Sequence, residues 1–234
     1  MTMHPVVSKQ DWTAARLDLL AKEKAFTRAR DALSAARRAL PWEKVETDYV
    51  FAGENGPVRL SELFAGRSQL IIQHFMFGAD WKAGCPHCSF WMDNYEGIVV
   101  HLNHRDVSLA AVSRAPIERL LAYRKRMAWS FTWVSSLGNS FNADFAVSFT
   151  PEQIAAGTNN YNFGTQHAGM SEAPGLSVFA KDDGGIFRTY STYSRGLDML
   201  NGAYHLLDLV PKGRDEGEDG VDWLRRHDEY EKIA

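Results

Sequence analysis

The chain has 234 residues, of which 45% are apolar, 12% aromatic and 24% charged. These values are typical of globular proteins, so they exclude a disordered chain, a collagen-like repeat and a disulfide-rich miniprotein. The 26 basic and 29 acidic residues give a net charge of −3, which gives no sign of a nucleic-acid partner. No apolar run is long enough to span a membrane, and charged residues arrive too early for a signal-peptide core. We therefore expect a cytoplasmic protein with neither a membrane nor a nucleic-acid partner.

Residues 8–40 predict one long helix. Ser8 and Asp11 form a start that is similar to a capping box, and Pro41 ends the pattern. Along this helix an apolar residue recurs every seven positions, at Trp12, Leu19, Phe26, Leu33 and Leu40. Such a stripe fits either packing against the chain's own globular domain or pairing with a second copy in a homodimer.

The next stretch alternates between strand-like and helix-like patterns. Residues 44–51 and 58–60 predict short strands around a turn at residues 53–57. Residues 70–77, 107–112 and 131–134 predict buried strands, separated by a helix over residues 85–103 and by another that starts at Pro116. Strands that alternate with helices predict an α/β fold around a mixed, mostly parallel sheet.

Residues 135–172 form a connection that is uncommonly long for a segment without function or structure of its own. After it, residues 176–179 and 186–193 predict a hairpin around a turn at residues 182–185, and residues 197–209 predict a last amphipathic helix. Residues 214–234 are rich in charge, with Val221, Trp223 and Leu224 as the side chains that would dock. The predicted organisation is a helical extension over residues 1–44, a domain over residues 45–213 that contains the 135–172 insertion, and a charged tail over residues 214–234.

The two cysteines form one motif, Cys85-Pro86-His87-Cys88. A bridge between them would close too short a loop to stabilise the fold, so the pair indicates chemistry. A helix that begins after Cys85 aims free N–H groups at its sulfur, Pro86 suits the first turn, and His87 adds a cation that favours the thiolate. The motif predicts thiol–disulfide exchange with Cys85 as the nucleophile and Cys88 as the resolving thiol, against the alternative of a merely structural pair.

Zinc binding is the other alternative, because Cys85, Cys88, His101 and His104 nearly match the spacing of a zinc finger. Only two residues separate the histidines, where a finger has three to five. A continuous helix would also carry them roughly 20 Å beyond the cysteines. We therefore expect neither a metal nor a cofactor.

The order of a strand, a Cys-x-x-Cys helix, a second strand and helix, a proline-led hairpin and a last helix resembles the thioredoxin fold. More closely, residues 74–91, 174–179 and 189–216 resemble the bacterial thioredoxin-like family catalogued as domain of unknown function 899. The resemblance implies a thioredoxin-like fold, with a central sheet flanked by helices, and a dithiol–disulfide oxidoreductase activity. The partners that it implies are a disulfide substrate and an electron donor, neither of which it identifies.

The resemblance also implies individual site residues. Ala173 and Pro174 stand where thioredoxins carry a cis-proline opposite the dithiol, and a simple edge or turn proline is the alternative. His74 lies in the strand that carries a buried acid in thioredoxins, so it either takes the place of that acid or is a core histidine bonded to the backbone. Trp81 stands four positions before Cys85, and not directly before it as in the thioredoxin signature.

In a thioredoxin arrangement the end of the 135–172 segment must approach the dithiol. We expect Tyr161, Phe163 and His167 to line a pocket beneath a partial lid that favours small disulfides, unless the segment only decorates the sheet. A thiol peroxidase is the second candidate function, weakened by Lys82, which stands where peroxiredoxins carry threonine. The third candidate is a non-enzymatic ligand-binding module with the dithiol as its redox switch.

Overall fold

A computed structural model describes residues 4–218 and 220–231, which divide into one unit that ends at Pro41 and another that begins at Trp42. The first unit consists of helix α1 (Lys9–Arg38), so the predicted long helix is confirmed. Ser8 caps it: the Ser8 hydroxyl accepts a hydrogen bond from the Asp11 amide and donates one to the Asp11 carboxylate. The cap forms because the Ser8 hydroxyl satisfies an amide group that has no partner inside the helix.

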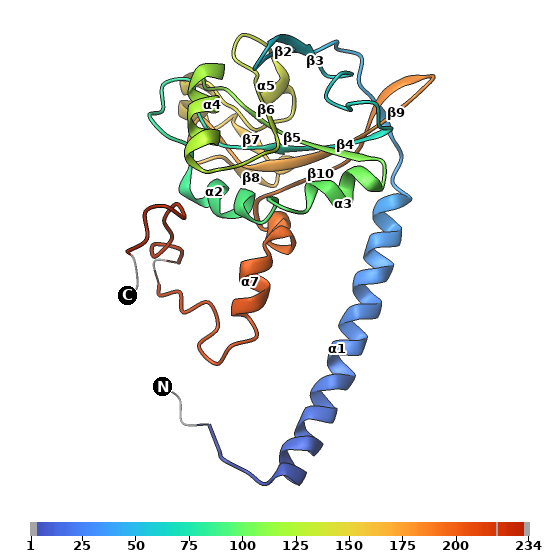
Figure 1. The fold of residues 1–234 in the computed structure, drawn as a ribbon, viewed down its shortest axis with the longest axis vertical. Coiled ribbons are helices and arrows are strands. Elements are labelled where there is room, and N and C mark those ends of the chain that lie inside the picture. Colours follow the sequence, from blue (N-terminus) through green and yellow to red (C-terminus); the bar gives the residue numbers. More distant parts are fainter. Residues whose placement is uncertain (1–3, 219, 232–234) are drawn as a thin grey trace. The chain divides into compact units, whose positions relative to one another are not determined.

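The second unit is built on a mixed sheet of eight strands in the order β1-β10-β9-β4-β5-β6-β2-β3 (Figure 1). The strands are β1 (Glu43–Lys44), β2 (Val50–Gly53), β3 (Gly56–Arg59), β4 (Gln69–His74), β5 (Val107–Ser113), β6 (Thr132–Ser135), β9 (Gly175–Asp182) and β10 (Gly185–Tyr193). β4 and β6 lie parallel to β5 at the centre, and the other neighbouring pairs are antiparallel. The sheet is mixed as predicted, but the prediction that it is mostly parallel is wrong, because hairpins and antiparallel edge strands extend it on both sides. A separate pair, β7 (Asn160–Tyr161) and β8 (Gln166–His167), lies within the 135–172 segment.

Outside the 135–172 segment, where α5 and α6 are additional, the helices of this unit follow the predicted order with two differences. They are α2 (Pro86–Asp93), α3 (Val99–His104), α4 (Ile117–Arg126), α5 (Phe141–Asp144), α6 (Pro151–Ala155), a 3-10 helix (Ser194–Leu200) and α7 (Gly202–Leu207). The helix predicted over residues 85–103 is two helices, because Gly97 between them takes a left-handed φ of 84°. The last helix is also broken, at Asn201, whose extended backbone ends the 3-10 helix and caps α7.

The strand before the dithiol motif separates two cores. Successive side chains of β4 point to opposite faces of the sheet, so Leu70 and Ile72 pack on one face while Ile71 packs on the other. The first core receives Phe141 and other aromatic side chains of the 135–172 segment. The second core holds both cysteines together with side chains of α2 and α4. Figure 1 shows α2 and α3 on one side of the sheet and α5 on the other.

The placement of these elements confirms the thioredoxin-like fold. α2 follows the central strand β4, β5 pairs with β4 in parallel, and the hairpin of β9 and β10 adds to the other edge of β4 in antiparallel orientation. The predicted turn at residues 182–185 joins the two hairpin strands.

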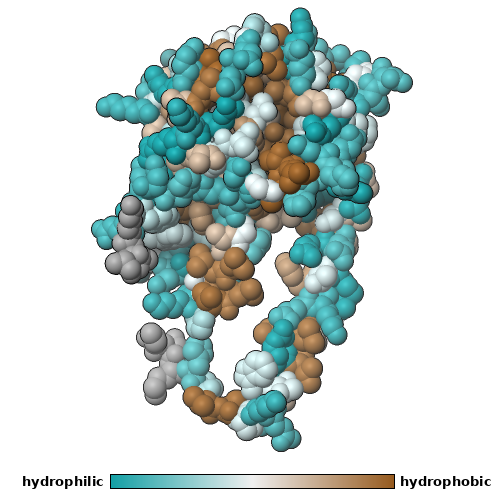
Figure 2. Space-filling view, in the orientation of Figure 1, coloured by the Kyte–Doolittle hydropathy of each residue, from teal (hydrophilic) through white to brown (hydrophobic). Residues whose placement is uncertain are grey.

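No helix in the described part of the chain has the length and apolar character that crossing a membrane requires. Figure 2 shows hydrophobic side chains gathered around α7, where Leu206, Leu209 and Val210 are exposed.

Candidate dithiol site

Cys85 occupies the N-cap of α2, directly before Pro86 in the first turn. The Cys85 amide donates to the Met76 carbonyl at 3.0 Å, which fastens the loop after β4. The Cys85 carbonyl accepts from both the amide and the hydroxyl of Ser89, at 3.0 and 2.9 Å. The backbone around Cys85 is therefore held on both sides, and the free N–H groups of the first turn of α2 lie beside its side chain.

The two cysteines are free thiols that lie 4.1 Å apart. A hydrogen bond from Cys88 is the largest cause that lowers the pKa of Cys85 well below that of an ordinary thiol. Burial opposes this effect, while His87, whose Nδ1 lies 3.8 Å from the Cys85 sulfur, adds to it. The same contact with Cys85, together with burial, raises the pKa of Cys88 well above its usual range. The pair therefore divides into one thiolate and one protonated thiol.

His87 completes this charge arrangement. The pKa of His87 is raised first by its hydrogen bond to Cys85, and further by the charges of Cys85 and of Asp222 in the C-terminal part of the chain. A raised pKa keeps the imidazole protonated closer to neutral pH, and the imidazolium in turn favours the Cys85 thiolate.

A cavity of about 670 Å³ opens onto the dithiol. Six of the predicted site residues line it, namely Trp81, Cys85, Pro86, His87, Cys88 and Pro174. An adjoining cavity of about 500 Å³ shares Pro174 with it and is lined by Tyr161, His167 and Ala173. Phe163 lines neither cavity: its side chain is 71% exposed, and its ring contacts Tyr193 at a centroid distance of 5.3 Å. The predicted residues thus lie around two neighbouring cavities, with Phe163 outside both.

The bond between Ala173 and Pro174 is trans, since the described residues contain no cis peptide bond, so the prediction of a cis-proline is wrong. The chain before Pro174 is extended and paired: Ser148 bridges to Glu172, and the Ala173 amide donates to the Val147 carbonyl at 2.9 Å. A trans bond continues this extended course directly into β9. Pro174 nevertheless lines the same cavity as Cys85, as expected for a residue that faces the dithiol.

His74 does not take the place of a thioredoxin acid beside the dithiol. It packs against Phe141 and Phe145 in the first core, on the face of the sheet opposite the cysteines, with its ring centroid 5.5 Å from each of theirs. Its Nε2 contacts the Ser177 hydroxyl at 2.8 Å, so its hydrogen bond goes to a side chain and not to the backbone. Burial lowers the pKa of His74 to about 3, which keeps the ring neutral.

Gln73, the preceding residue, is the one that points toward the dithiol, because neighbouring side chains of a strand point to opposite faces. Gln73 lines the dithiol cavity, and its side-chain oxygen accepts from the Tyr95 hydroxyl at 2.9 Å. The polar group that this strand presents to the cysteines is therefore an amide, which does not titrate.

Residues 1–230 match the family described as bacterial protein of unknown function (DUF899). The chain belongs to this family. No curated protein matches the chain.

Several solved structures are similar to this DUF899 chain in fold alone. Peroxidoxin BcpB from Mycobacterium tuberculosis is 13% identical, with a TM-score of 0.49, over 69% of this chain and 94% of that one. Peroxiredoxin Q from Xanthomonas campestris is 14% identical, with a TM-score of 0.45, over 71% and 96% of the two chains. The mitochondrial 2-Cys peroxiredoxin from Plasmodium falciparum is also 14% identical, with a TM-score of 0.42, over 71% and 93%.

The C-terminal quarter of the chain supplies cavity residues that sequence reasoning missed. They come from the 3-10 helix, from α7 and from the segment that follows, and they are Ser194, Arg195, Leu197, Asp198, Tyr204, Glu216, Val221 and Arg226. Their distance from the motif along the sequence hid them. The one signal was the presence of Val221, Trp223 and Leu224 in a charged tail, and of these Leu224 is buried and Val221 lines the cavity.

Proposed function

We propose that this protein is a thiol–disulfide oxidoreductase in which Cys85 is the nucleophile and Cys88 the resolving thiol. One observation carries the proposal. The two cysteines lie 4.1 Å apart beside a cavity, and the pKa of Cys85 is lowered while the pKa of Cys88 is raised. Titratable neighbours whose environments separate their pKa values are typical of reactive sites.

The reaction follows from the charges of the pair. The Cys85 thiolate attacks one sulfur of a substrate disulfide and the substrate S–S bond breaks. One half of the substrate departs as a thiolate, and the other half stays bound to Cys85 in a mixed disulfide. Cys88 gives its proton to that leaving thiolate and attacks the Cys85 sulfur, which releases the second substrate thiolate and forms the Cys85–Cys88 disulfide. The substrate gains two electrons and the protein loses two, and an external thiol reductant must return them.

The geometry also orders these two attacks. Contact with Cys85 is the largest cause of the raised pKa of Cys88. When Cys85 enters the mixed disulfide it loses its negative charge, and this cause disappears. Cys88 therefore becomes easier to deprotonate only after the first attack has taken place, which keeps it from competing for the substrate.

The experiment is a single-turnover reaction of the reduced protein with dithiodipyridine, a neutral disulfide whose released thiol absorbs light. The native protein should release two equivalents of thiol. Cys88→Ser should release one equivalent of thiol and keep a mixed disulfide on Cys85 that mass spectrometry detects. Cys85→Ser should show no thiol release as fast as that of the native protein. Release of two equivalents by Cys88→Ser would contradict the assigned roles.

A parallel reaction with hydrogen peroxide distinguishes the second candidate function. A thiol peroxidase would use the same Cys85 thiolate, but its dithiol would be oxidised faster by peroxide than by dithiodipyridine. A ligand-binding module with a redox switch would react with both slowly, and its ligand binding would survive Cys85→Ser. We expect the disulfide to react faster than the peroxide.

A further inference from the structure

Residues 214–218 and 220–231, here called the C-terminal segment, form the outer wall of the dithiol cavity. Glu216, Val221 and Arg226 line this cavity together with Cys85. Leu224 is buried, with 4% of its surface exposed, so the segment is packed onto the domain and is not a solvated tail. A charged stretch at the end of the chain has thus become part of the site.

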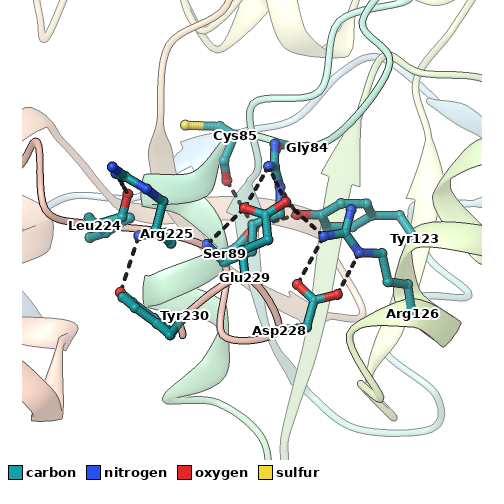
Figure 3. Close-up of polar contacts among 11 residues, drawn as sticks. Gly84, Cys85, Ser89, Tyr123, Arg126, Leu224, Arg225, Asp228, Glu229 and Tyr230 are labelled. Carbon is teal, nitrogen blue, oxygen red and sulfur yellow. Dashed lines mark hydrogen bonds and ion pairs between the residues drawn. The ribbon is translucent and has the colours of Figure 1, made fainter. Parts of the chain in front are cut away.

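Arg226 joins the C-terminal segment to the loop that carries Cys85. Its guanidinium donates to the Gly84 carbonyl, one residue before Cys85, at 2.6 Å, and to the Tyr123 hydroxyl at 2.8 Å. Tyr123 in turn contacts Ser89 at 2.8 Å, and Ser89 donates to the Cys85 carbonyl. Figure 3 shows Gly84, Cys85, Ser89 and Tyr123 next to one another in this network.

Carboxylates hold the arginine in this position. Arg226 donates to both oxygens of Glu229, at 2.9 and 3.1 Å, and its side chain is only 15% exposed. Glu229 and Asp228 also accept from Arg126 of α4 at 2.6 to 2.9 Å (Figure 3). Charge-assisted hydrogen bonds are stronger than neutral ones, so these bonds hold this end of the segment on the domain, with both carboxylates about one-third exposed.

A second set of contacts lies along α2, on the side away from the sheet. The Trp223 ring packs edge-on against Phe90 at 5.7 Å, and His227 contacts the Asp93 carboxylate at 2.8 Å. The C-terminal segment therefore contacts the loop before α2 at Gly84, the middle of the helix at Phe90 and its last residue, Asp93.

The cavity that this wall encloses presents apolar surface to a substrate. Its larger apolar lining residues are Met76, Trp81, Trp91, Met170, Leu197 and Val221. The charged groups of the lining are occupied within the protein: Asp198 pairs with Arg214 at 3.0 Å, Glu216 accepts from Tyr204 at 2.8 Å, and Arg226 is bonded as described. Arg195 also pairs with Asp198, at 3.7 Å, and its side chain is 83% exposed.

The access of a substrate disulfide to the Cys85 sulfur is limited as well. Cys85 has 9% of its surface exposed, and attack on a disulfide requires the three sulfur atoms to come into line. A slender molecule inside a 670 Å³ cavity meets this condition. A disulfide on the surface of a folded protein does not, unless the wall first opens.

We propose that the C-terminal segment restricts this dithiol to small disulfides with uncharged, apolar groups and excludes disulfides of folded proteins. The proposal rests on the proposed function. It differs from the expectation of a lid made by residues 135–172, because the wall belongs to another part of the chain, and Arg226 is its positioning residue.

The test compares single-turnover rates of the reduced full-length protein with dithiodipyridine and with insulin, a protein disulfide. Arg226→Ala should raise the ratio of the insulin rate to the dithiodipyridine rate by at least about tenfold, because it detaches the wall from Gly84 and Tyr123. Arg225→Ala is the matched control. Within the described residues the Arg225 guanidinium donates only to carbonyls of its own segment, those of Asp222 and Leu224, so this variant should keep the native ratio. An Arg226→Ala variant with the native ratio would overturn the proposal, even if both rates changed together.

A second variant tests the apolar lining without releasing the wall. Val221→Arg puts a cation into the cavity, so dithiodipyridine should react more slowly and the dianion dithiobis(nitrobenzoate) faster than with the native protein. Unchanged rates for both reagents would show that the wall does not contact the substrate and would overturn the proposal. A native protein that reduces insulin as fast as dithiodipyridine would overturn it too but leave the proposed function intact, whereas failure to react with any disulfide would refute the function itself.

Discussion

The ionisation of Cys85 depends on two neighbours, Cys88 and His87. The hydrogen bond from Cys88 lowers the pKa of Cys85 most, and the hydrogen bond and charge of His87 lower it further. Since both effects favour the thiolate, Cys85 should stay ionised at pH values where an ordinary thiol, with a pKa of about 8.5, is protonated. Cys88, with its raised pKa, should stay protonated over the same range.

The pH dependence of alkylation tests this division. Iodoacetamide should modify Cys85 before Cys88 in the reduced protein, and the rate should fall only in acid. His87→Ala should move the midpoint of the rate upward by about one pH unit or more, because loss of a nearby cation disfavours the thiolate. His101→Ala, an exposed histidine on α3, should keep the native midpoint. Faster labelling of Cys88, or an unchanged midpoint in His87→Ala, would contradict this account.

At the scale of elements, the 135–172 segment connects the first core to the cavities. Phe141, Phe145 and Phe149 are buried in that core, so much of the segment is structural. Tyr161 at the end of β7 has a different position. Its hydroxyl donates to the carbonyl of Pro174, before β9, and accepts from the amide of Ser194, after β10. One side chain thus holds two residues of the dithiol cavity, while the lid itself stays a prediction.

Tyr161→Phe removes this hydroxyl, so the Pro174 carbonyl and the Ser194 amide, both partly buried, each lose a hydrogen-bond partner. We expect the free energy of unfolding to fall by about 1 to 3 kcal/mol, which is the usual cost of a buried polar group that loses its partner. Urea denaturation measures it. Phe163→Leu, at an exposed ring two residues away, should cost less than about 1 kcal/mol. Equal stability of Tyr161→Phe and the native protein would show that the hydroxyl does not hold these strands.

On the scale of the whole molecule, the question concerns helix α1 and the surface against which its apolar stripe packs. Within this helix no residue is buried, and the stripe residues Trp12, Leu19, Phe26 and Leu33 are exposed, as is Leu40 just beyond its end. A heptad stripe of this kind is typical of helices that pair with one another. We propose that α1 pairs with α1 of a second copy.

Sedimentation velocity tests the dimer. The native protein should sediment as a dimer, and Phe26→Glu should make it a monomer with the same helix content by circular dichroism, because it places a charge in the stripe. Ala35→Glu makes the same change of charge half a turn around the helix, nine residues on, and should leave the dimer intact. A native protein that sediments as a monomer would refute the pairing.

The sequence by itself determined the features that depend on neighbouring residues. The cap at Ser8, the turn between β9 and β10, the strand before the motif and the position of Cys85 directly before a helix all follow from local patterns, and the structure has each of them. Caps, turns and strand periodicity are set within a few residues of chain, so they can be predicted without knowing the rest of the fold. The chemistry proposed for the motif comes from the same local information.

The tertiary structure alone decided what surrounds the dithiol. Strand pairing and core packing turned Gln73 toward the cysteines and His74 away from them, and the pairing of residues 147–148 with 172–173 leads into a trans bond before Pro174. The outer wall depends on the hydrogen bond from Arg226 to Gly84, between residues 142 positions apart in the chain. Contacts of this kind leave no periodic trace in a sequence, because they depend on which surfaces meet after the chain has folded.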